Sequence, residues 1–329
     1  MTLFNAFWVE KTEGGYTQSV VERSIDDLSE GEVLIKVSYS SLNYKDALSA
    51  KGMPGVTRSY PHTPGIDAAG QVVSSTNPAY KEGDSVICIG FDLGMDTPGG
   101  FGEYVRVPAD WLSPLPAGLT LRESMILGTA GFTAALCLEK LERMGALPKD
   151  GPVFVTGATG GVGSVAVALF AKIGFEVTAI TGKPGSSDYL ESLGVSKIVM
   201  REELEHNNSK PLLAAAYAHG IDTVGGNILS NLIKSLSYGG SIAVCGLVAS
   251  PKIEASVLPF ILRGINVLGV DSVNLPITKK TETWAKLASE WKLDTLSDIA
   301  QEIELEQVSK AIEDVFSGKN VGRIVIAHK

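Results

Sequence analysis

A glycine-rich turn that could bind phosphate lies at residues 157–163, within the segment VFVTGATGGVGSVAVALF (residues 153–170). A short apolar strand pattern precedes the turn and an apolar helical pattern follows it. Glycines in this context let backbone N–H groups approach a pyrophosphate at the positive end of the helix. The spacing GxxGxxG is weaker evidence than GxGxxG, and glycines used only for helix–strand packing are the alternative. We expect dinucleotide contacts from Gly157, Gly160, Gly161, Val162 and Gly163.

The end of the next predicted strand, residues 176–181, bears on which dinucleotide binds. NAD-binding proteins usually carry a carboxylate there for the ribose 2′-hydroxyl, whereas this chain has Thr181, Gly182 and Lys183. A hydroxyl and a cation suit a 2′-phosphate, so NADPH is predicted; the alternative for Lys183 is an ordinary surface lysine. Arg201, after the following strand, is either a second cation over the adenine end or an exposed charge at a helix start.

Two carboxylates lie in segments that otherwise look buried, Asp46 in SSLNYKDA (residues 40–47) and Asp67 in PGIDAAG (residues 64–70). Carboxylates are rarely buried unpaired. Either these two brace the loop by accepting backbone N–H groups, or one of them takes part in proton delivery.

The elements that would position these residues fall into two regions. Short runs rich in β-branched residues, separated by Gly and Pro, fill the first third of the chain and predict a compact β-barrel or sandwich. From the helical pattern at residues 124–143 onward, strands and helices alternate, including strands at 152–156, 222–224 and 266–270, which predicts a doubly wound parallel sheet. A helix at 306–316 and a strand at 323–327 could return to the first region. The predicted domains are 1–122 with 296–329, and 123–295.

The net charge limits the classes of molecule that the protein is expected to bind. The 329 residues hold 28 Lys and Arg against 37 Asp and Glu, a net charge of −9, which argues against nucleic-acid binding. Three separated cysteines suit a reducing compartment. The N-terminus has no signal-peptide pattern and no apolar stretch reaches the ~18 residues needed to span a bilayer. We expect a cytoplasmic protein that does not bind membranes.

The motifs together resemble the medium-chain dehydrogenase/reductase superfamily along nearly the whole chain. SSLNYKDA is similar to its quinone-oxidoreductase-like branch, and with PGID (residues 64–67), TGK (181–183) and PFILRG (259–264) it resembles the NADPH-dependent acryloyl-CoA reductase subgroup. The resemblance implies a GroES-like β-barrel catalytic domain, a Rossmann domain and a homodimer formed through the Rossmann domain.

Two departures from the zinc-dependent branch of that superfamily concern its metal. Zinc alcohol dehydrogenases carry a Cys in the segment matching 43–46 and Gly-His-Glu where this chain has Gly65-Ile66-Asp67. A catalytic zinc needs three protein ligands, and 3 Cys and 4 His lie too far apart in sequence to supply them. We therefore expect no metal.

The resemblance also implies roles for single residues. Tyr44 would border both the nicotinamide and the substrate, where its phenol could donate to a carbonyl oxygen or protonate an enolate; a packing tyrosine is the alternative. Asn43 would orient a substrate through its amide. The nicotinamide carboxamide would be held by residues matching the family's backbone and Asn positions: Leu247, Ile261, Ser272 and Asn320.

These features favour one reaction class. Without a Lewis acid an alcohol is hard to oxidise, whereas hydride addition to a conjugated C=C bond yields an enolate that hydrogen bonds can stabilise. The expected activity is NADPH-dependent reduction of an α,β-unsaturated acyl thioester, acryloyl-CoA first. A quinone or small enone is the alternative substrate, and a non-catalytic NADPH-binding protein is the alternative class. Lys51, Arg58 and Arg263 are candidate cations for the CoA phosphates.

Overall fold

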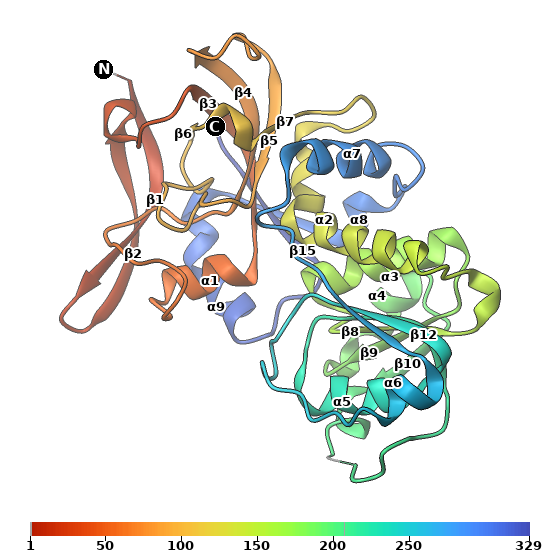
Figure 1. Ribbon diagram of the computed structural model, residues 1–329. Coiled ribbons are helices and arrows are strands. Elements are labelled where there is room, and N and C mark those ends of the chain that lie inside the picture. Colours follow the sequence, from red (N-terminus) through yellow and green to blue (C-terminus); the bar gives the residue numbers. More distant parts are fainter. Residues whose placement is uncertain (1, 207) are drawn as a thin grey trace. The chain divides into compact units, whose positions relative to one another are not determined.

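The computed structural model describes residues 2–206 and 208–329 and divides into two compact units (Figure 1). Unit 1 runs to Thr129 and again from Ser272 to Lys329, and unit 2 is Ala130–Asp271. The chain thus returns to unit 1 at Ser272, earlier than the predicted residue 296. Helix α7 (Ile277–Leu287) explains the difference, because its Lys280 is buried in unit 1 and donates to the carbonyl of Ile89 at 2.6 Å.

Unit 1 is built around a largely antiparallel sheet with the strand order β14-β15-β3-β4-β5-β7, and β6 also pairs with β3. Its strands are β3 (Val33–Leu42), β4 (Asp67–Ser75), β5 (Ser85–Ile89), β6 (Tyr104–Val107), β7 (Leu112–Pro114), β14 (Ala300–Ile303) and β15 (Arg323–Ala327). Its other helices are α1 (Tyr44–Ala50), α8 (Leu296–Ile299) and α9 (Val308–Phe316). The C-terminal strand β15 pairs antiparallel with β3, so residues 323–327 lie in one sheet with residues 33–42.

The sequence did not predict the hairpin of β1 (Leu3–Thr12) and β2 (Gly15–Ser24), which forms a separate two-stranded sheet. Phe7 and Val9 of β1 are buried, whereas β2 is mostly half-exposed and carries polar residues at many positions. Such a strand has little hydrophobic pattern to detect. Val9 exchanges two backbone hydrogen bonds with His62, of 2.8 and 2.9 Å, which joins β1 to the rest of unit 1.

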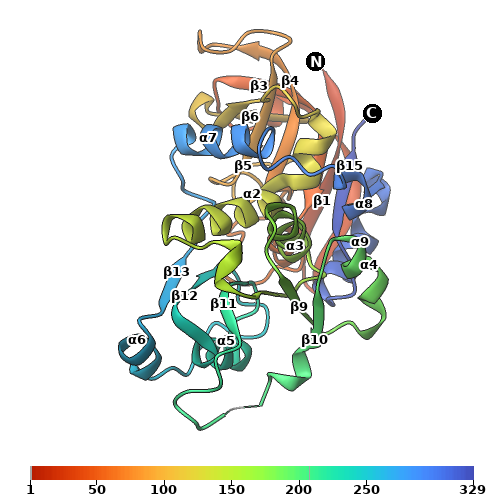
Figure 2. The same ribbon diagram turned by 90° about the vertical axis from the view of Figure 1, so that its right-hand side faces the viewer.

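Unit 2 is an α/β unit with a parallel sheet of order β10-β9-β8-β11-β12-β13. Figure 2 shows β10 and β13 at opposite ends of this sheet. The strands are β8 (Val153–Thr156), β9 (Val177–Thr181), β10 (Lys197–Met200), β11 (Tyr217–Asp222), β12 (Leu236–Val244) and β13 (Asn266–Gly269). From β8 the chain adds β9 and β10 on one side of the sheet, and then β11, β12 and β13 on the other side. The boundary between β8 and β11 is therefore the switch point of the sheet. Doubly wound sheets bind ligands at the carboxyl ends of the strands at this point. The predicted fold class is confirmed.

The helices of unit 2 are α3 (Gly161–Ile173), α4 (Ser187–Ser192), α5 (Gly226–Lys234) and α6 (Leu258–Arg263). One strand differs from the prediction, because β11 ends at Asp222, where the predicted strand 222–224 begins. Its residues His219 and Gly220 lack a β-forming pattern. Gly220 is required because the Phe154 ring lies 2.3 Å from the position that its Cβ would take.

Helix α2 (Leu121–Arg143) is long and apolar enough to cross a bilayer by length and composition, which the sequence analysis did not anticipate. However, 89% of its most apolar window is buried inside the protein, as is usual for a core helix. The helix is also interrupted, since Gly128 has φ 51° and ψ −158°.

Candidate active site

The first polar site lies where β3 ends and α1 begins. Asn43 precedes α1, and the Asp46 carboxylate accepts the N–H of Asn43 and that of Ile66, both at 2.8 Å. Asp46 is fully buried. Burial, and then the negative charge of Asp67, raise the pKa of Asp46 to about 7. Asp46 therefore ties the first turn of α1 to the loop before β4.

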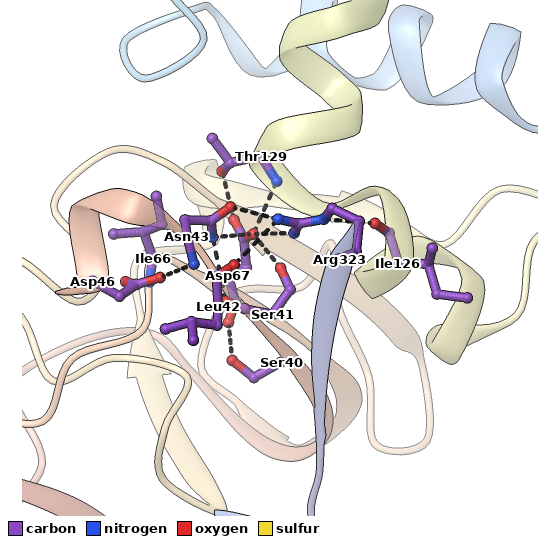
Figure 3. A network of polar contacts seen from close by, with 10 residues as sticks. All are labelled: Ser40, Ser41, Leu42, Asn43, Asp46, Ile66, Asp67, Ile126, Thr129 and Arg323. Carbon is purple, nitrogen blue, oxygen red and sulfur yellow. Dashed lines mark hydrogen bonds and ion pairs between the residues drawn. The ribbon is translucent and has the colours of Figure 1, made fainter. Parts of the chain in front are cut away.

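Asp67, the first residue of β4, is the centre of this polar network (Figure 3). Its carboxylate accepts the Asn43 side-chain N–H at 2.7 Å, the Thr129 backbone N–H at 2.9 Å, and the hydroxyls of Ser41 and Thr129. Arg323 adds an ion pair, with Nη2 3.9 Å from Oδ2. Every bond comes from a neighbouring element of unit 1, and the carboxylate is closed to solvent.

Arg323, the first residue of β15, was missed by the sequence analysis. It is 2% exposed, and its Nη1 donates to the Leu42 carbonyl and to Asn43 Oδ1, both at 3.2 Å, while Nε donates to the Ile126 carbonyl at 2.9 Å. The sequence does place an arginine at the start of an apolar strand. A cation that is buried with such a strand requires a buried partner, and this could have identified Arg323 as part of a polar site.

The network occupies both ends of the Asn43 amide, which is 9% exposed. The Asn43 amide thus has a structural role, joining Asp67 to Arg323. The two fully buried carboxylates, Asp46 and Asp67, fit the bracing role left open by the sequence.

Tyr44 is the outward-facing member of this group. It is the first residue of α1, is 37% exposed, and stacks on Phe316 of α9 with ring centroids 6.5 Å apart. The neighbouring Lys51 is paired with Glu313. Tyr44 is thus much more exposed than Asn43, Asp46, Asp67 and Arg323, the buried members of this site.

The residues in 2–206 and 208–329 contain no group of three or more His, Cys, Asp or Glu side chains suited to hold a metal. In the two segments where the family resemblance places zinc ligands, residues 43–46 and 65–67, the chain has the Asn43 amide, which is bonded to Asp67 and Arg323, and the apolar Ile66. The donor set does not fit zinc.

The second site lies at the switch point in unit 2. The turn after β8 begins with Gly157 at φ 59°, and α3 begins at Gly161. A Cβ on Gly163 would lie 2.1 Å from the Gly157 carbonyl oxygen, so this position requires glycine for the turn to close. Thr159 Oγ1 lies 3.3 Å from Thr181 Oγ1 and links this turn to the end of β9.

The residues expected at the adenine end lie together beyond β9. The Arg201 guanidinium covers Gly182, since a Cβ there would meet Nε at 2.5 Å, and Arg201 also pairs with Glu205 at 3.1 Å. Lys183 is half-buried, and burial lowers its pKa. The Lys183 N–H donates to Thr181 Oγ1 at 3.2 Å. Gly182 thus lies under the Arg201 guanidinium and is followed in the sequence by Lys183.

The remaining expected cofactor residues are distributed over both units. Leu247 and Ile261 of unit 2 are 60% and 69% exposed, whereas Ser272 of unit 1 is buried. Asn320 of unit 1 donates to the Gly322 carbonyl at 3.0 Å.

The Arg263 guanidinium is occupied by backbone carbonyls of unit 2. It donates to the carbonyls of Leu213, Lys234 and Leu236 at 2.6–2.9 Å, which is a structural role.

Comparison with known proteins finds a matching family model for each part of the fold. Residues 29–117 match the alcohol dehydrogenase GroES-like domain, and residues 161–291 match the zinc-binding dehydrogenase family. A solved structure of the yhdH oxidoreductase from Salmonella enterica in complex with NADP has a TM-score of 0.96 and 41% identity, covering 99% of this chain and 100% of that chain.

Two relatives match over almost their full length. The acrylyl-CoA reductase AcuI of Ruegeria pomeroyi is 43% identical over 98% of this chain and 99% of its own. YhfP of Bacillus subtilis, named as a candidate quinone oxidoreductase, is 44% identical over 99% of both chains, and its crystal structure holds NAD. The chain belongs to the medium-chain dehydrogenase/reductase superfamily, in the quinone-oxidoreductase-like group that includes AcuI and YhfP.

Proposed function

We propose that this protein uses NADPH to reduce the C=C bond of an α,β-unsaturated acyl thioester, with acryloyl-CoA as substrate and propanoyl-CoA as product. The observation that carries the proposal is the 43% identity to an acrylyl-CoA reductase across 98% of the chain. The exposed Tyr44 phenol on its braced helix supplies a suitable group for the reaction.

The cofactor site supports NADPH. Lys183 and Arg201 beside Gly182 would hold the 2′-phosphate, and the N–H groups around Gly157–Gly163 would hold the pyrophosphate. We also assign Leu247, Ile261, Ser272 and Asn320 to the nicotinamide carboxamide, as the family resemblance implies. When bound, NADPH supplies the hydride.

Tyr44 has the chemistry that the thioester requires. Hydride addition at the β-carbon breaks the C=C π bond and places the electron pair on the α-carbon and the thioester oxygen. A hydrogen bond from the phenol would stabilise the developing enolate oxygen, and a proton added at the α-carbon completes the reduction. Hydrogen bonding replaces a Lewis acid in this scheme, so the reaction is zinc-independent, in keeping with the donor set around Asn43 and Ile66.

A quinone is the second candidate substrate, because YhfP is 44% identical and carries a quinone-oxidoreductase name. Steady-state oxidation of NADPH with acryloyl-CoA, crotonyl-CoA and a benzoquinone separates the two. Our proposal requires acryloyl-CoA to have the highest kcat/KM. Faster turnover of the quinone than of either thioester would contradict it, and NADPH binding without any turnover would indicate a non-catalytic protein.

We further propose a cytoplasmic homodimer formed through unit 2. Strand β13 is at the edge of the parallel sheet, and its Val267 is 37% exposed. Nearby in sequence, Val257 and Leu262 are 68% and 56% exposed. Unpaired edge strands beside exposed apolar residues favour association with another chain. The three cysteines are free thiols, which suits a reducing compartment.

A further inference from the structure

The interruption of α2 at Gly128 leaves two helix ends inside unit 1, and two charged side chains satisfy them (Figure 3). Arg323 Nε donates to the Ile126 carbonyl at 2.9 Å, just before the break. Asp67 accepts the Thr129 N–H at 2.9 Å, just after it. Helix carbonyl ends favour a cation and helix N–H ends favour an anion. The positive Arg323 therefore lies at the carbonyl end of the first helical segment, and the negative Asp67 lies at the N–H end of the second.

The same two side chains also hold Asn43. Asp67 accepts from the Asn43 amide nitrogen at 2.7 Å, and Arg323 donates to the amide oxygen at 3.2 Å. Because amide nitrogen and oxygen have opposite hydrogen-bonding character, this pairing allows one orientation of the side chain. Asn43 immediately precedes Tyr44, so its position sets where α1 begins.

There is little room for this arrangement to adjust. Arg323 and Asp67 are 2% and 0% exposed. A Cβ at Gly128 would lie 2.4 Å from Ser41 Oγ and 2.5 Å from Asp67 Oδ2. The helix break and the start of α1 are thus fixed by one buried cluster.

We propose that Arg323 is a positioning residue for the reduction: by holding Asn43 and the α2 break together with Asp67, it sets the orientation of the Tyr44 phenol. This inference rests on the proposed role of Tyr44. Arg323 itself reaches neither substrate nor solvent.

The test is a double-mutant cycle on steady-state kinetics. Arg323→Lys keeps the charge but loses the guanidinium fork that reaches Ile126, Leu42 and Asn43 together. We expect kcat to fall about tenfold or more, with KM for NADPH unchanged. In a Tyr44→Phe background the same change should lower kcat by less than about twofold. Equal losses in both backgrounds would overturn the proposal.

Two further variants separate positioning from folding. Asn43→Leu has a similar shape and leaves the Arg323–Asp67 pair in place, so it should reproduce the loss of kcat. Arg122→Lys alters an exposed ion pair with Glu302 in the same unit and should leave kcat unchanged. Full activity of Asn43→Leu would contradict the proposed connection.

Hydrogen exchange tests the proposal independently of activity. In Arg323→Lys, amides of residues 43–50 should exchange faster, whereas those of residues 153–173 should not. Unchanged exchange at 43–50 would overturn the positioning role even if acryloyl-CoA is the substrate. Faster exchange in a protein that reduces no thioester would contradict the proposed function and still support the positioning role.

Discussion

The residues of the polar site between β3 and α1 differ in how far their side chains are exposed to solvent. Tyr44 is 37% exposed, whereas Asn43, Asp46 and Asp67 are 9% exposed or less and have their polar atoms bonded within the protein. The phenol is therefore open to solvent, whereas the two carboxylates are closed to it. We infer that chemistry at this site depends on Tyr44 and that the other three act by holding it.

The Tyr44 hydroxyl can be tested by Tyr44→Phe, which keeps the ring and its stacking on Phe316. Loss of the donor to the enolate oxygen should lower kcat/KM for acryloyl-CoA by about 10²-fold and leave KM for NADPH little changed. Tyr238→Phe, at an 86% exposed tyrosine of unit 2, is the control. An unchanged kcat/KM would reduce Tyr44 to a packing residue.

Lys183 should discriminate between the two dinucleotides. Lys183→Glu replaces a cation with an anion at the proposed 2′-phosphate site, which should weaken NADPH binding roughly ten- to hundredfold and NADH binding much less. Titration calorimetry with both cofactors measures this. Lys197→Glu, at the opposite end of the strand that precedes Arg201, should change neither affinity. Equal weakening of both cofactors would remove the 2′-phosphate role.

His328 should make the protein less stable in acid. Burial lowers the pKa of His328 to about 4, from 6.5 when unfolded. Between pH 7 and pH 5 the unfolded chain therefore takes up a proton that the folded protein does not. This lowers the free energy of unfolding by about 2 kcal/mol.

Urea unfolding of wild type and His328→Gln at both pH values isolates that contribution. The raised pKa of Asp46 has the opposite effect, because the folded protein binds this proton more tightly than the unfolded chain and the free energy of unfolding falls as pH rises toward 7. This contribution is the same in wild type and in His328→Gln, so it cancels in the comparison. A wild type that loses no more stability than His328→Gln would contradict the shift.

At the scale of elements, the break in α2 is the feature most sensitive to substitution. Gly128 combines φ 51° with ψ −158°, a region that side-chain-bearing residues avoid, and its Cβ would collide with Ser41 and Asp67. Gly128→Ala should therefore lower stability by about 3 kcal/mol or more. Gly174→Ala, at φ 98° but with open space around it, should lower it by only about 1 kcal/mol. Similar effects in calorimetry would contradict this account.

Helices and strands with a strong local sequence pattern could be predicted, whereas features set by distant residues could not. The strand at 323–327 is found as predicted, because Ile-Val-Ile-Ala is strongly β-forming and Gly322 precedes it. The break in α2 was not predicted, since a single glycine in a helical pattern is usually tolerated. What fixes Gly128 is the cluster around Asp67, which comes from distant parts of the chain.

The sites were predictable to different degrees for the same reason. The glycine turn is contiguous, so its spacing could be read directly from residues 157–163. Arg323 lies 281 residues from Leu42, to whose carbonyl it donates. The sequence can indicate that an arginine in an apolar strand needs a partner, but not which distant residues provide it. The sequence also could not show that both ends of the Asn43 amide bond to Asp67 and Arg323.

At the scale of the whole molecule, the proposed dimer predicts a solution mass of twice 34.7 kDa. Val267→Asp places a charge on the exposed edge strand β13 and should yield monomers in sedimentation velocity. Val73→Asp is matched in exposure, at 38% against 37%, but lies in unit 1 and should leave the dimer intact. A wild-type monomer, or a Val267→Asp dimer, would contradict the interface.

The central claim is that hydride from NADPH reaches the β-carbon of an acyl thioester. The most direct measurement follows deuterium from NADPH labelled at the transferred position during reduction of acryloyl-CoA. We predict propanoyl-CoA with one deuterium at the β-carbon and none at the α-carbon. Label at the α-carbon, or NADPH oxidised without labelled propanoyl-CoA, would contradict the account.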